Sequence, residues 1–381
     1  MLRSLAAGLL ALSLPAVADA QTIVSTGDDL AAVVAAAASG DVIQIDSDAT
    51  FVGTLVLAGK SLTIEAGPGF SPTVRGSTDG ASALVVPGSP GTVATLRGLE
   101  LAPGDPSVGL PSPPGLAITS VGTSTDSLDL LLEDCTLTGK LRTSGTGDAA
   151  CAVTVVDSLL LDDLNLFGTL TTPIQIALKD CEVVGATIVT CNDAFGSPRK
   201  MVLDLARTAF EGTVALNATA GGSLTTTSTS CIVDGTGQPL AIGVRVLGDA
   251  VAQFTNTTVT GWWIGIEGVA GASWHNLLLH GNDSDLAGVL PGQIQTSLIE
   301  DGTYDGLDGN FAGPAWLDAD LALLDCSPGL DAGSNTAPGL GAKDVYGNPR
   351  ILDNDGDLTA TVNVGAVEPT GSVAGQALPF N

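Results

Sequence analysis

A short pattern of apolar and polar positions recurs along the middle of the chain. The copies read LEDCTLTG at residue 132, VVDSLLLD at 155, LKDCEVVG at 178, LARTAFEG at 205, STSCIVDG at 228, FTNTTVTG at 254, WHNLLLHG at 274 and QTSLIEDG at 295. Aligned on Cys135, Ser158, Cys181, Thr208, Cys231, Thr257, Leu277 and Ser297, they lie 23, 23, 27, 23, 26, 20 and 20 residues apart. A period in this range is typical of a solenoid.

Apolar and polar residues alternate within each copy, and a glycine often follows. Apolar side chains stand three positions before the aligned residue and two positions after it, as Leu132 and Leu137 do around Cys135. Alternation of period two predicts strands with one buried face. The glycine four positions after the aligned residue predicts a turn with unusual dihedral angles. Because no helical pattern separates the copies, we expect an all-β, right-handed parallel β-helix.

Three cysteines fall in the aligned position. Equivalent residues of successive coils lie about 4.8 Å apart, so Cys135, Cys181 and Cys231, each two coils from the next, are too distant for disulfides. They are predicted to fill the core as small apolar side chains that alternate with Ser158 and Thr208. The pairing of Cys151, Cys191 and Cys326 stays open.

The beginning of the chain follows a different pattern. An Ala-rich amphipathic segment follows Asp28 and Asp29, either of which can cap a helix that ends near Gly40. Three strand-like runs come next: DVIQID, GTLVLAG and SLTIEAG. The open end of a solenoid exposes sheet edges, so we expect this helix to cap the β-helix. The Pro-rich and Gly-rich stretch 104–116 predicts a loop thrown out from one coil.

The first 20 residues have the features of a secretory signal peptide. Arg3 precedes an apolar run from Leu5 to Leu14, and Ala18-Asp19-Ala20 provides a cleavage signal. The run is shorter than the roughly 20 residues that span a bilayer. We therefore expect a secreted or cell-surface protein without a transmembrane segment, divided into a signal peptide (1–20), a β-helix with its N-terminal cap (21–308), a C-terminal block (309–371) and a tail (372–381).

The residues quoted so far carry two family resemblances. The cap segment with GDVIQID and KSLTIEAG resembles the first coils of pectin-lyase-like β-helix proteins. The stretch from Gly309 to Pro369 resembles the bacterial choice-of-anchor Q domain family in its successive motifs GNFAGPAWLD, CSPGLDAGS, KDVYGNPR, DNDGD and VNVGAVE. It departs from the family pattern at Cys326, Asn363 and Val367. The resemblance implies a secreted or surface-displayed β-helix that the C-terminal block closes, although the short tail gives no sign of covalent anchoring.

The net charge of the chain limits the kinds of molecule that it can bind. The chain carries 41 acidic and 13 basic residues, for a formal net charge of −28. Such a surface repels nucleic acid and anionic membranes and attracts cations. We therefore expect no nucleic-acid partner, and we look for partners among extracellular polysaccharides and components of the cell envelope.

Two groups of acidic residues are candidate cation sites. Asp353, Asp355 and Asp357 alternate in DNDGD, a spacing that can direct three carboxylates at one Ca²⁺ ion. The twelve-residue calcium-loop pattern fails there, so the alternative is an acidic β-turn closed by pairing of Arg350 with Glu368. Equivalent positions of three successive copies hold Asp134, Asp157 and Asp180, which either point into water, pair with Arg207 or share a cation.

No catalytic residue is predicted. The histidines, His275 and His280, are expected at the surface. Trp262 and Trp263 are candidate carbohydrate contacts, because exposed indole rings stack on sugars and two adjacent strand residues cannot both point inward. The predicted function is a non-catalytic, exported surface or extracellular-matrix β-helix that binds carbohydrate. The alternative is a polysaccharide lyase or glycoside hydrolase of the pectin-lyase-like fold.

Overall fold

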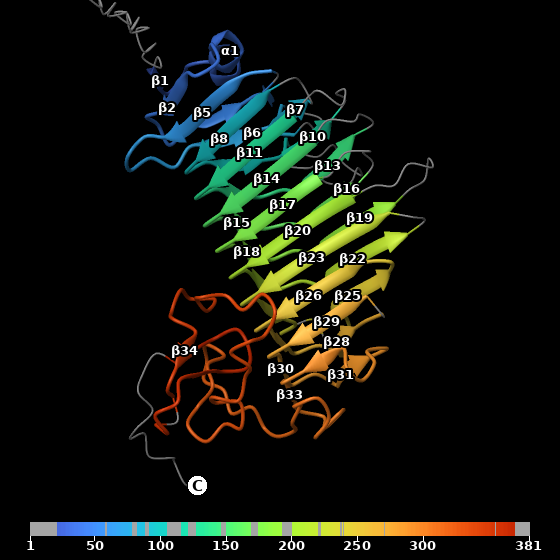
Figure 1. The fold of residues 1–381 in the computed structure, drawn as a ribbon. Helices are drawn as coiled ribbons and strands as arrows, with labels where there is room; N and C mark the ends of the chain where they lie inside the picture. Colours follow the sequence, from blue (N-terminus) through green and yellow to red (C-terminus); the bar gives the residue numbers. More distant parts are fainter. Residues whose placement is uncertain are drawn as a thin grey trace, which may run out of the picture.

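The computed structural model describes residues 21–369 apart from 58, 78–81, 88–90, 105–115, 121–126, 146–149, 169–173, 193–199, 220–221, 237, 239, 270 and 355. The chain winds into a parallel β-solenoid whose coils stack along one axis (Figure 1). The predicted signal peptide, the tail and most of the predicted loop at 104–116 lie outside the described residues. No helix in the described part is long and apolar enough to cross a membrane.

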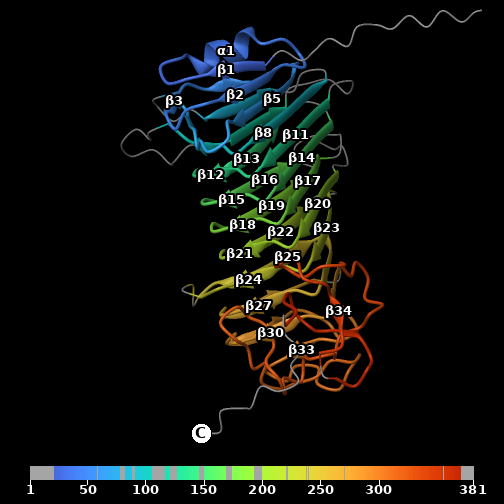
Figure 2. The same ribbon diagram turned by 90° about the vertical axis from the view of Figure 1, so that its left-hand side faces the viewer.

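Each full coil contributes one strand to each of three sheets (Figure 2). Within the described residues, sheet A has 12 strands: Gln21–Val24 (β1), Val42–Ile45 (β2), Ser61–Ala66 (β5), Thr92–Arg97 (β8), Ser127–Glu133 (β11), Ala150–Val156 (β14), Ile174–Lys179 (β17), Lys200–Ala206 (β20), Ser223–Thr229 (β23), Val251–Thr255 (β26), Ala272–His275 (β29) and Ile294–Gln295 (β32).

Sheet B follows sheet A within each coil and has the shortest strands. Its 11 described strands are Thr50–Val52 (β3), Thr73–Arg75 (β6), Glu100–Ala102 (β9), Thr136–Leu137 (β12), Leu159–Leu160 (β15), Glu182–Val183 (β18), Ala209–Phe210 (β21), Ile232–Asp234 (β24), Thr258–Thr260 (β27), Leu278–His280 (β30) and Leu298–Ile299 (β33).

Sheet C completes the coil. Its 10 described strands are Leu55–Val56 (β4), Leu84–Pro87 (β7), Leu116–Ser120 (β10), Leu141–Gly145 (β13), Leu164–Gly168 (β16), Thr187–Asn192 (β19), Val214–Thr219 (β22), Ile242–Gly248 (β25), Ile264–Glu267 (β28) and Ser284–Ala287 (β31). All ladders between coils are parallel in the described part, which confirms the predicted parallel β-helix.

The predicted register is confirmed. Leu132, Val155 and Leu178 are partners in sheet A, and they are fully buried because alternate side chains of each strand point inward. The aligned residues form a buried column, and all six cysteines are free. Burial raises the pKa of the Cys135 and Cys181 thiols to about 11, so these side chains are uncharged core fillers.

The recurrent glycine has a different role in most coils from the one predicted. Gly261 and Gly281 have the expected positive φ, 78° and 64°. Gly185 and Gly212 do not, but a Cβ atom at either position would lie 2.4 Å from backbone atoms of the preceding coil. Glycine is needed there because two turns approach closely, whatever its dihedral angles.

The N-terminal helix is present but shorter than expected. Helix α1 spans Leu30–Ala36, and the Asp29 carboxylate accepts a hydrogen bond from the Ala32 N–H at 3.0 Å. Leu30 and Val34 are buried in the core cluster, and the helix lies at the N-terminal end of the solenoid (Figure 1). The three predicted strand runs are confirmed as β2, β4 and β5. The capping role of the helix stays a prediction.

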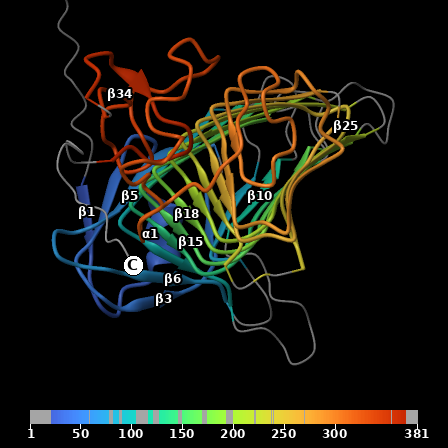
Figure 3. The ribbon, with the colours of Figure 1, turned by 90° about the horizontal axis from the view of Figure 1, so that it is seen from below.

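The C-terminal segment, residues 309–369, begins at the end of the solenoid and then turns back beside the last coils (Figure 1), and the view from below shows it to one side of the solenoid (Figure 3). Phe311 forms a bridge to Leu298 of the last coil. The rest has little regular structure except the antiparallel pair Ile351–Leu352 (β34) and Thr361–Val362 (β35). The segment therefore covers the flank of the last coils as well as the solenoid end.

Candidate functional site

The turn between sheets A and B is the most regular surface feature. In eight successive coils one residue there has a positive φ of 49° to 57°, and these residues are Asp134, Asp157, Asp180, Arg207, Ser230, Asn256, Asn276 and Thr296. Each donates its backbone N–H to a carbonyl of the next coil or, for Thr296, to Asp308, at 3.0 to 3.2 Å. We call this row the left-handed corner. Asp and Asn tolerate such dihedral angles best among non-glycine residues, which explains why they fill five of these positions.

The corner has an open half and a covered half. Asp134 and Asp157 are exposed, and Asp180 and Arg207 are half-buried. Ser230, Asn256 and Asn276 are fully buried beneath the C-terminal segment. The exposed positions hold carboxylates whereas the buried ones hold neutral polar groups, as expected from the large free-energy cost of burying an unpaired charge.

The covered half is held by a dense set of hydrogen bonds. Asn256 Nδ2 donates to the carbonyl of Asn363 at 2.8 Å. The Asn276 side chain accepts from the Ser334 N–H at 2.8 Å and donates to the Ser334 carbonyl at 3.1 Å. Each side chain meets both donor and acceptor needs of a buried amide, so the corner fixes where the C-terminal segment lies.

Arg350 is the centre of this interface. Its guanidinium donates to Ser230 Oγ at 3.2 Å, to the carbonyls of Gly365 and Ala366 at 2.9 and 2.8 Å, and to Glu368 Oε1 at 2.9 Å. Both charged side chains are completely buried. The predicted pairing of Arg350 with Glu368 is therefore confirmed. Burial raises the pKa of Glu368 to about 7, although the contact with Arg350 opposes the rise.

Asp344 organises the adjoining turn. Its carboxylate is fully buried and accepts from the N–H groups of Tyr346, Asn348 and Glu368 and from the Asn348 side chain. These bonds close the turn that contains Tyr346 and Asn348. A buried carboxylate with four donors is well satisfied, so Asp344 has a structural role.

The open half lines two adjoining grooves. One, of about 630 Å³, includes Glu65, Arg97, Glu133, Asp134 and Asp157. The next, of about 480 Å³, shares Asp157 and continues past Asp180, Glu182 and Arg207 to Tyr346 of the C-terminal segment. Together they contain six carboxylates and two arginines. Arg97 pairs with Glu133 at 2.6 Å, and Arg207 binds Asp180 through two bonds of 2.5 and 2.7 Å. The alternative that Arg207 pairs with this acidic row is thus confirmed for Asp180.

The two adjacent tryptophans lie on opposite faces of one turn. Trp262 is 2% exposed, and its indole N–H donates to the Val233 carbonyl at 3.0 Å. Gly235 and Gly243 make room for its ring, since a Cβ atom on either would lie within 2.8 Å of it. A carbohydrate contact at Trp262 is therefore wrong, because the ring is enclosed by the core. Trp263 is 49% exposed and keeps this role as a prediction.

The structure describes the residues of the DNDGD loop other than Asp355. Asp353 accepts from the N–H groups of Gly356 and Leu358 at 2.9 and 3.0 Å, and Asp357 accepts from Thr359 at 2.7 Å. These bonds are those of an acidic turn. Asp355 lies outside the described residues, so Ca²⁺ binding by all three aspartates stays a prediction. In the rest of the described chain no cluster of three or more ligand side chains is arranged for a metal ion.

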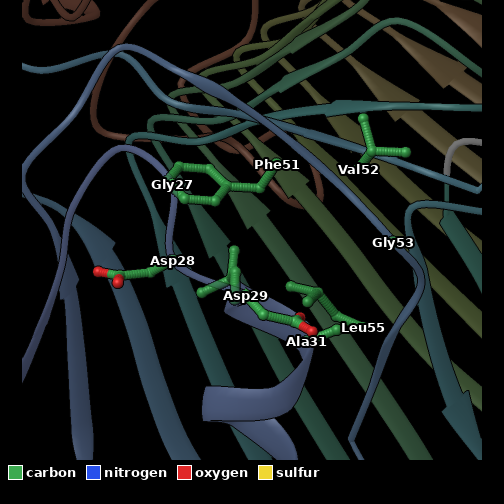
Figure 4. A pocket seen from close by; sticks show the side chains of 9 residues that line it. Gly27, Asp28, Asp29, Ala31, Phe51, Val52, Gly53 and Leu55 are labelled. Carbon is green, nitrogen blue, oxygen red and sulfur yellow. The ribbon is translucent and has the colours of Figure 1, made fainter.

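A cleft of about 250 Å³ lies beside the N-terminal helix. Asp28 and Asp29 line it and point apart (Figure 4). Asp28 accepts from the Ser25 N–H at 2.8 Å, and Asp29 caps the helix. Because both carboxylates serve their own backbone, this cleft is part of the fold.

The two histidines do not form a catalytic pair. His280 Nδ1 lies 2.8 Å from Glu300, with both side chains one-third exposed. His275 is half-buried on β29, and burial lowers its pKa. The two histidines lie on strands of different sheets.

Sequence reasoning missed one coil and the footprint of the C-terminal segment. The phrase TLRGLELA at 95 forms β8, a left-handed Gly98 and β9, and Leu96 and Leu101 join the buried columns. This copy of the repeat was not recognised in the sequence, because Gly98 stands where most other copies have a polar residue. The area that the C-terminal segment covers could have been predicted from the sequence. The corner residues change there from the charged Asp134, Asp157 and Asp180 to the neutral Ser230, Asn256 and Asn276.

Comparisons with known proteins do not assign the chain to a family. No known family model matches the chain. No match was found among curated proteins either.

Proposed function

We propose that this chain is an exported, non-catalytic surface or extracellular-matrix β-helix protein that binds carbohydrate through Trp263. The half-exposed indole of Trp263 is the observation that carries the proposal. Its backbone is held in place, because its neighbour Trp262 is enclosed by the core and the Trp263 N–H and carbonyl join the coils on either side. An exposed indole ring on such a backbone offers an apolar face on which a sugar ring can stack.

The charge of the molecule favours a neutral glycan. A net charge of −28 repels polyuronates at the approach stage, because like fields lower the rate of encounter. The signal-peptide features of residues 1–20 and the resemblance of residues 309–371 to the choice-of-anchor Q domain family support export and surface display. Neutral polysaccharides of the matrix or the cell envelope are therefore the ligands to test.

The test is co-sedimentation of the purified protein with insoluble neutral glycans, such as cellulose and xylan, and affinity electrophoresis in soluble ones. Trp316 provides a matched control, since its side chain is 48% exposed. We expect Trp263→Ala to weaken retention about tenfold and Trp316→Ala to leave it unchanged. Equal retention of both variants would contradict a role for Trp263.

A parallel incubation separates binding from catalysis. Neutral and uronic-acid glycans are kept with the protein for a day, with and without Ca²⁺, and the products are assayed for reducing and unsaturated ends. We expect neither kind of new end to form. New ends would replace the proposal by the lyase or hydrolase alternative.

A further inference from the structure

The residues around Trp263 indicate which kind of glycan its ring accepts. Trp263 lies in the turn between sheets B and C, and its backbone is joined to the coil on either side. Its N–H donates to the Ala241 carbonyl at 3.2 Å, and its carbonyl accepts from the Ser284 N–H at 3.0 Å. Leu240 and Asp283 precede these two partners in the chain. They therefore lie one coil away from Trp263, on opposite sides of it.

Leu240 adds an apolar side chain on the first side. It is 85% exposed, and Trp263 is 49% exposed. Large apolar side chains on neighbouring coils offer a ligand a wider apolar surface than one indole ring does. The face of a sugar ring, where C–H groups gather, matches such a surface.

Asp283 adds a negative charge on the second side. Its backbone N–H donates to the Trp262 carbonyl at 2.9 Å, which fixes it beside the tryptophan turn. Its side chain is exposed, and within the described residues its carboxylate forms no hydrogen bond or ion pair. Equivalent positions of successive coils lie about 4.8 Å apart, a spacing comparable with the width of a sugar ring. A ring stacked on Trp263 therefore directs a substituent on its edge toward Asp283.

The basic side chains on the strands beside this turn are already paired with carboxylates. Arg245 on β25 lies 2.5 Å from Glu267, and His280 on β30 lies 2.8 Å from Glu300. Neither is left to neutralise the carboxylate of Asp283. The surface beside Trp263 thus combines an exposed aromatic ring with an exposed carboxylate, and a cation on a ligand interacts favourably with both.

We propose that the surface of Leu240, Trp263 and Asp283 prefers a glycan that carries free amino groups, such as a de-N-acetylated polymer of glucosamine. This inference rests on the proposed function, because the sugar ring stacks on Trp263. The protonated amino group pairs with the Asp283 carboxylate at the edge of the indole. The net charge of −28 adds long-range attraction for such a polymer, which a neutral glycan does not gain.

Three soluble hexasaccharides are matched probes, because all are β-1,4-linked and differ only in the group on carbon 2. The glucosamine hexamer carries amino groups, the N-acetylglucosamine hexamer carries acetamido groups, and cellohexaose carries hydroxyl groups. Binding to the full mature protein is measured by isothermal titration calorimetry at pH 5.5, where the amino groups are charged. A salt concentration of 150 mM largely screens long-range attraction.

Three variants separate the contributions of the ring, the nearby carboxylate and the overall charge. Trp263→Ala removes the indole, and Asp283→Asn removes the carboxylate beside it. The control, Asp249→Asn, removes the same charge from an exposed residue in the turn between sheets C and A. Spermine is added as a competitor that carries ammonium groups without a sugar ring.

We expect the glucosamine hexamer to bind about fivefold more tightly than the other two hexamers. Asp283→Asn should lower its affinity about threefold to fivefold and leave that of cellohexaose unchanged. Asp249→Asn should leave both affinities unchanged. Trp263→Ala should weaken the binding of all three hexamers, because each stacks on the same ring.

Equal affinities of the three hexamers would overturn the preference for amino groups, and the proposed function would stand if Trp263→Ala still weakened them. Equal losses in Asp283→Asn and Asp249→Asn would show that only the overall charge attracts the amino glycan. Competition by spermine at the concentration of the glucosamine hexamer would show that the sugar ring is not needed. Full binding by Trp263→Ala, or no binding of any hexamer, would overturn both the inference and the proposed function.

Discussion

The two halves of the left-handed corner have the same backbone and opposite surfaces. Asp157 and Asn276 both have positive φ, 49° and 54°, and both donate their N–H to the next coil. Asp157 is exposed and charged, whereas Asn276 is fully buried and neutral. Backbone geometry therefore selects the small polar class of residue, and cover by another segment selects its charge. The following experiments test this division.

The largest effect is expected at the ion pair that anchors the covered half. Arg350→Met leaves the Glu368 carboxylate buried without its cation, which should destabilise the fold by about 3 to 5 kcal/mol. Urea unfolding followed by tryptophan fluorescence measures the loss, because Trp316 lies in the C-terminal segment.

The matched control for this variant is Arg245→Met. Arg245 pairs with Glu267 at 2.5 Å on the solenoid surface, with side chains 43% and 30% exposed. We expect a loss below about 1 kcal/mol there. Similar losses in the two variants would mean that the buried pair does not hold the C-terminal segment.

An exchange of residue types between the halves should have unequal effects. Asn276→Asp introduces a buried charge and removes the donor that Ser334 and Asn256 accept, at a cost of about 2 to 3 kcal/mol. Asp157→Asn should change stability by less than about 0.5 kcal/mol, because its side chain is exposed. Thermal unfolding of both variants measures the difference. A small effect of Asn276→Asp would show that the cover tolerates charge.

The covered half should also respond to pH. Burial raises the pKa of Glu368 to about 7 in the folded protein, where it faces Arg350 and Asp344. The folded state therefore holds this proton more tightly than the unfolded state, so its contribution to stability is present below pH 4.5 and lost as pH rises through 7. Urea midpoints at pH 5 and pH 8 should fall more steeply with pH in the wild type than in Glu368→Gln. Parallel profiles would exclude Glu368 as the source.

A small effect is expected in the buried column beside the corner, where the two halves are alike. Ser158 and Cys181 occupy neighbouring positions of the buried column, and the Ser158 hydroxyl donates to the Val156 carbonyl at 2.7 Å. Cys181→Ser can make the equivalent bond to the Lys179 carbonyl, which its thiol now contacts. We expect a change within about 1 kcal/mol. Thermal unfolding with thiol counting checks both this value and the six free cysteines.

The sequence predicted the solenoid well because its signal is local. The alternation around Cys135 and Cys181 records which side chains point inward, and stacking follows from the repeat. The path of the C-terminal segment was not predictable in this way, since its contacts join distant residues: Ser230 donates to the Lys343 carbonyl 113 positions away. The burial of Trp262 could not be predicted either, because it depends on the space that Gly235 and Gly243 leave for its ring.

The attachment of the C-terminal segment to three named coils has a consequence for how such molecules change in length. In the part of the chain that the structure describes, the corner residues whose side chains bond to this segment are Ser230, Asn256 and Asn276. A duplication of one whole coil upstream, for example residues 135–157, would preserve every parallel ladder and leave this attachment untouched. Each such duplication would lengthen the open half of the corner by about 4.8 Å. The length of the open half can therefore change in evolution without any change in the C-terminal segment or its attachment.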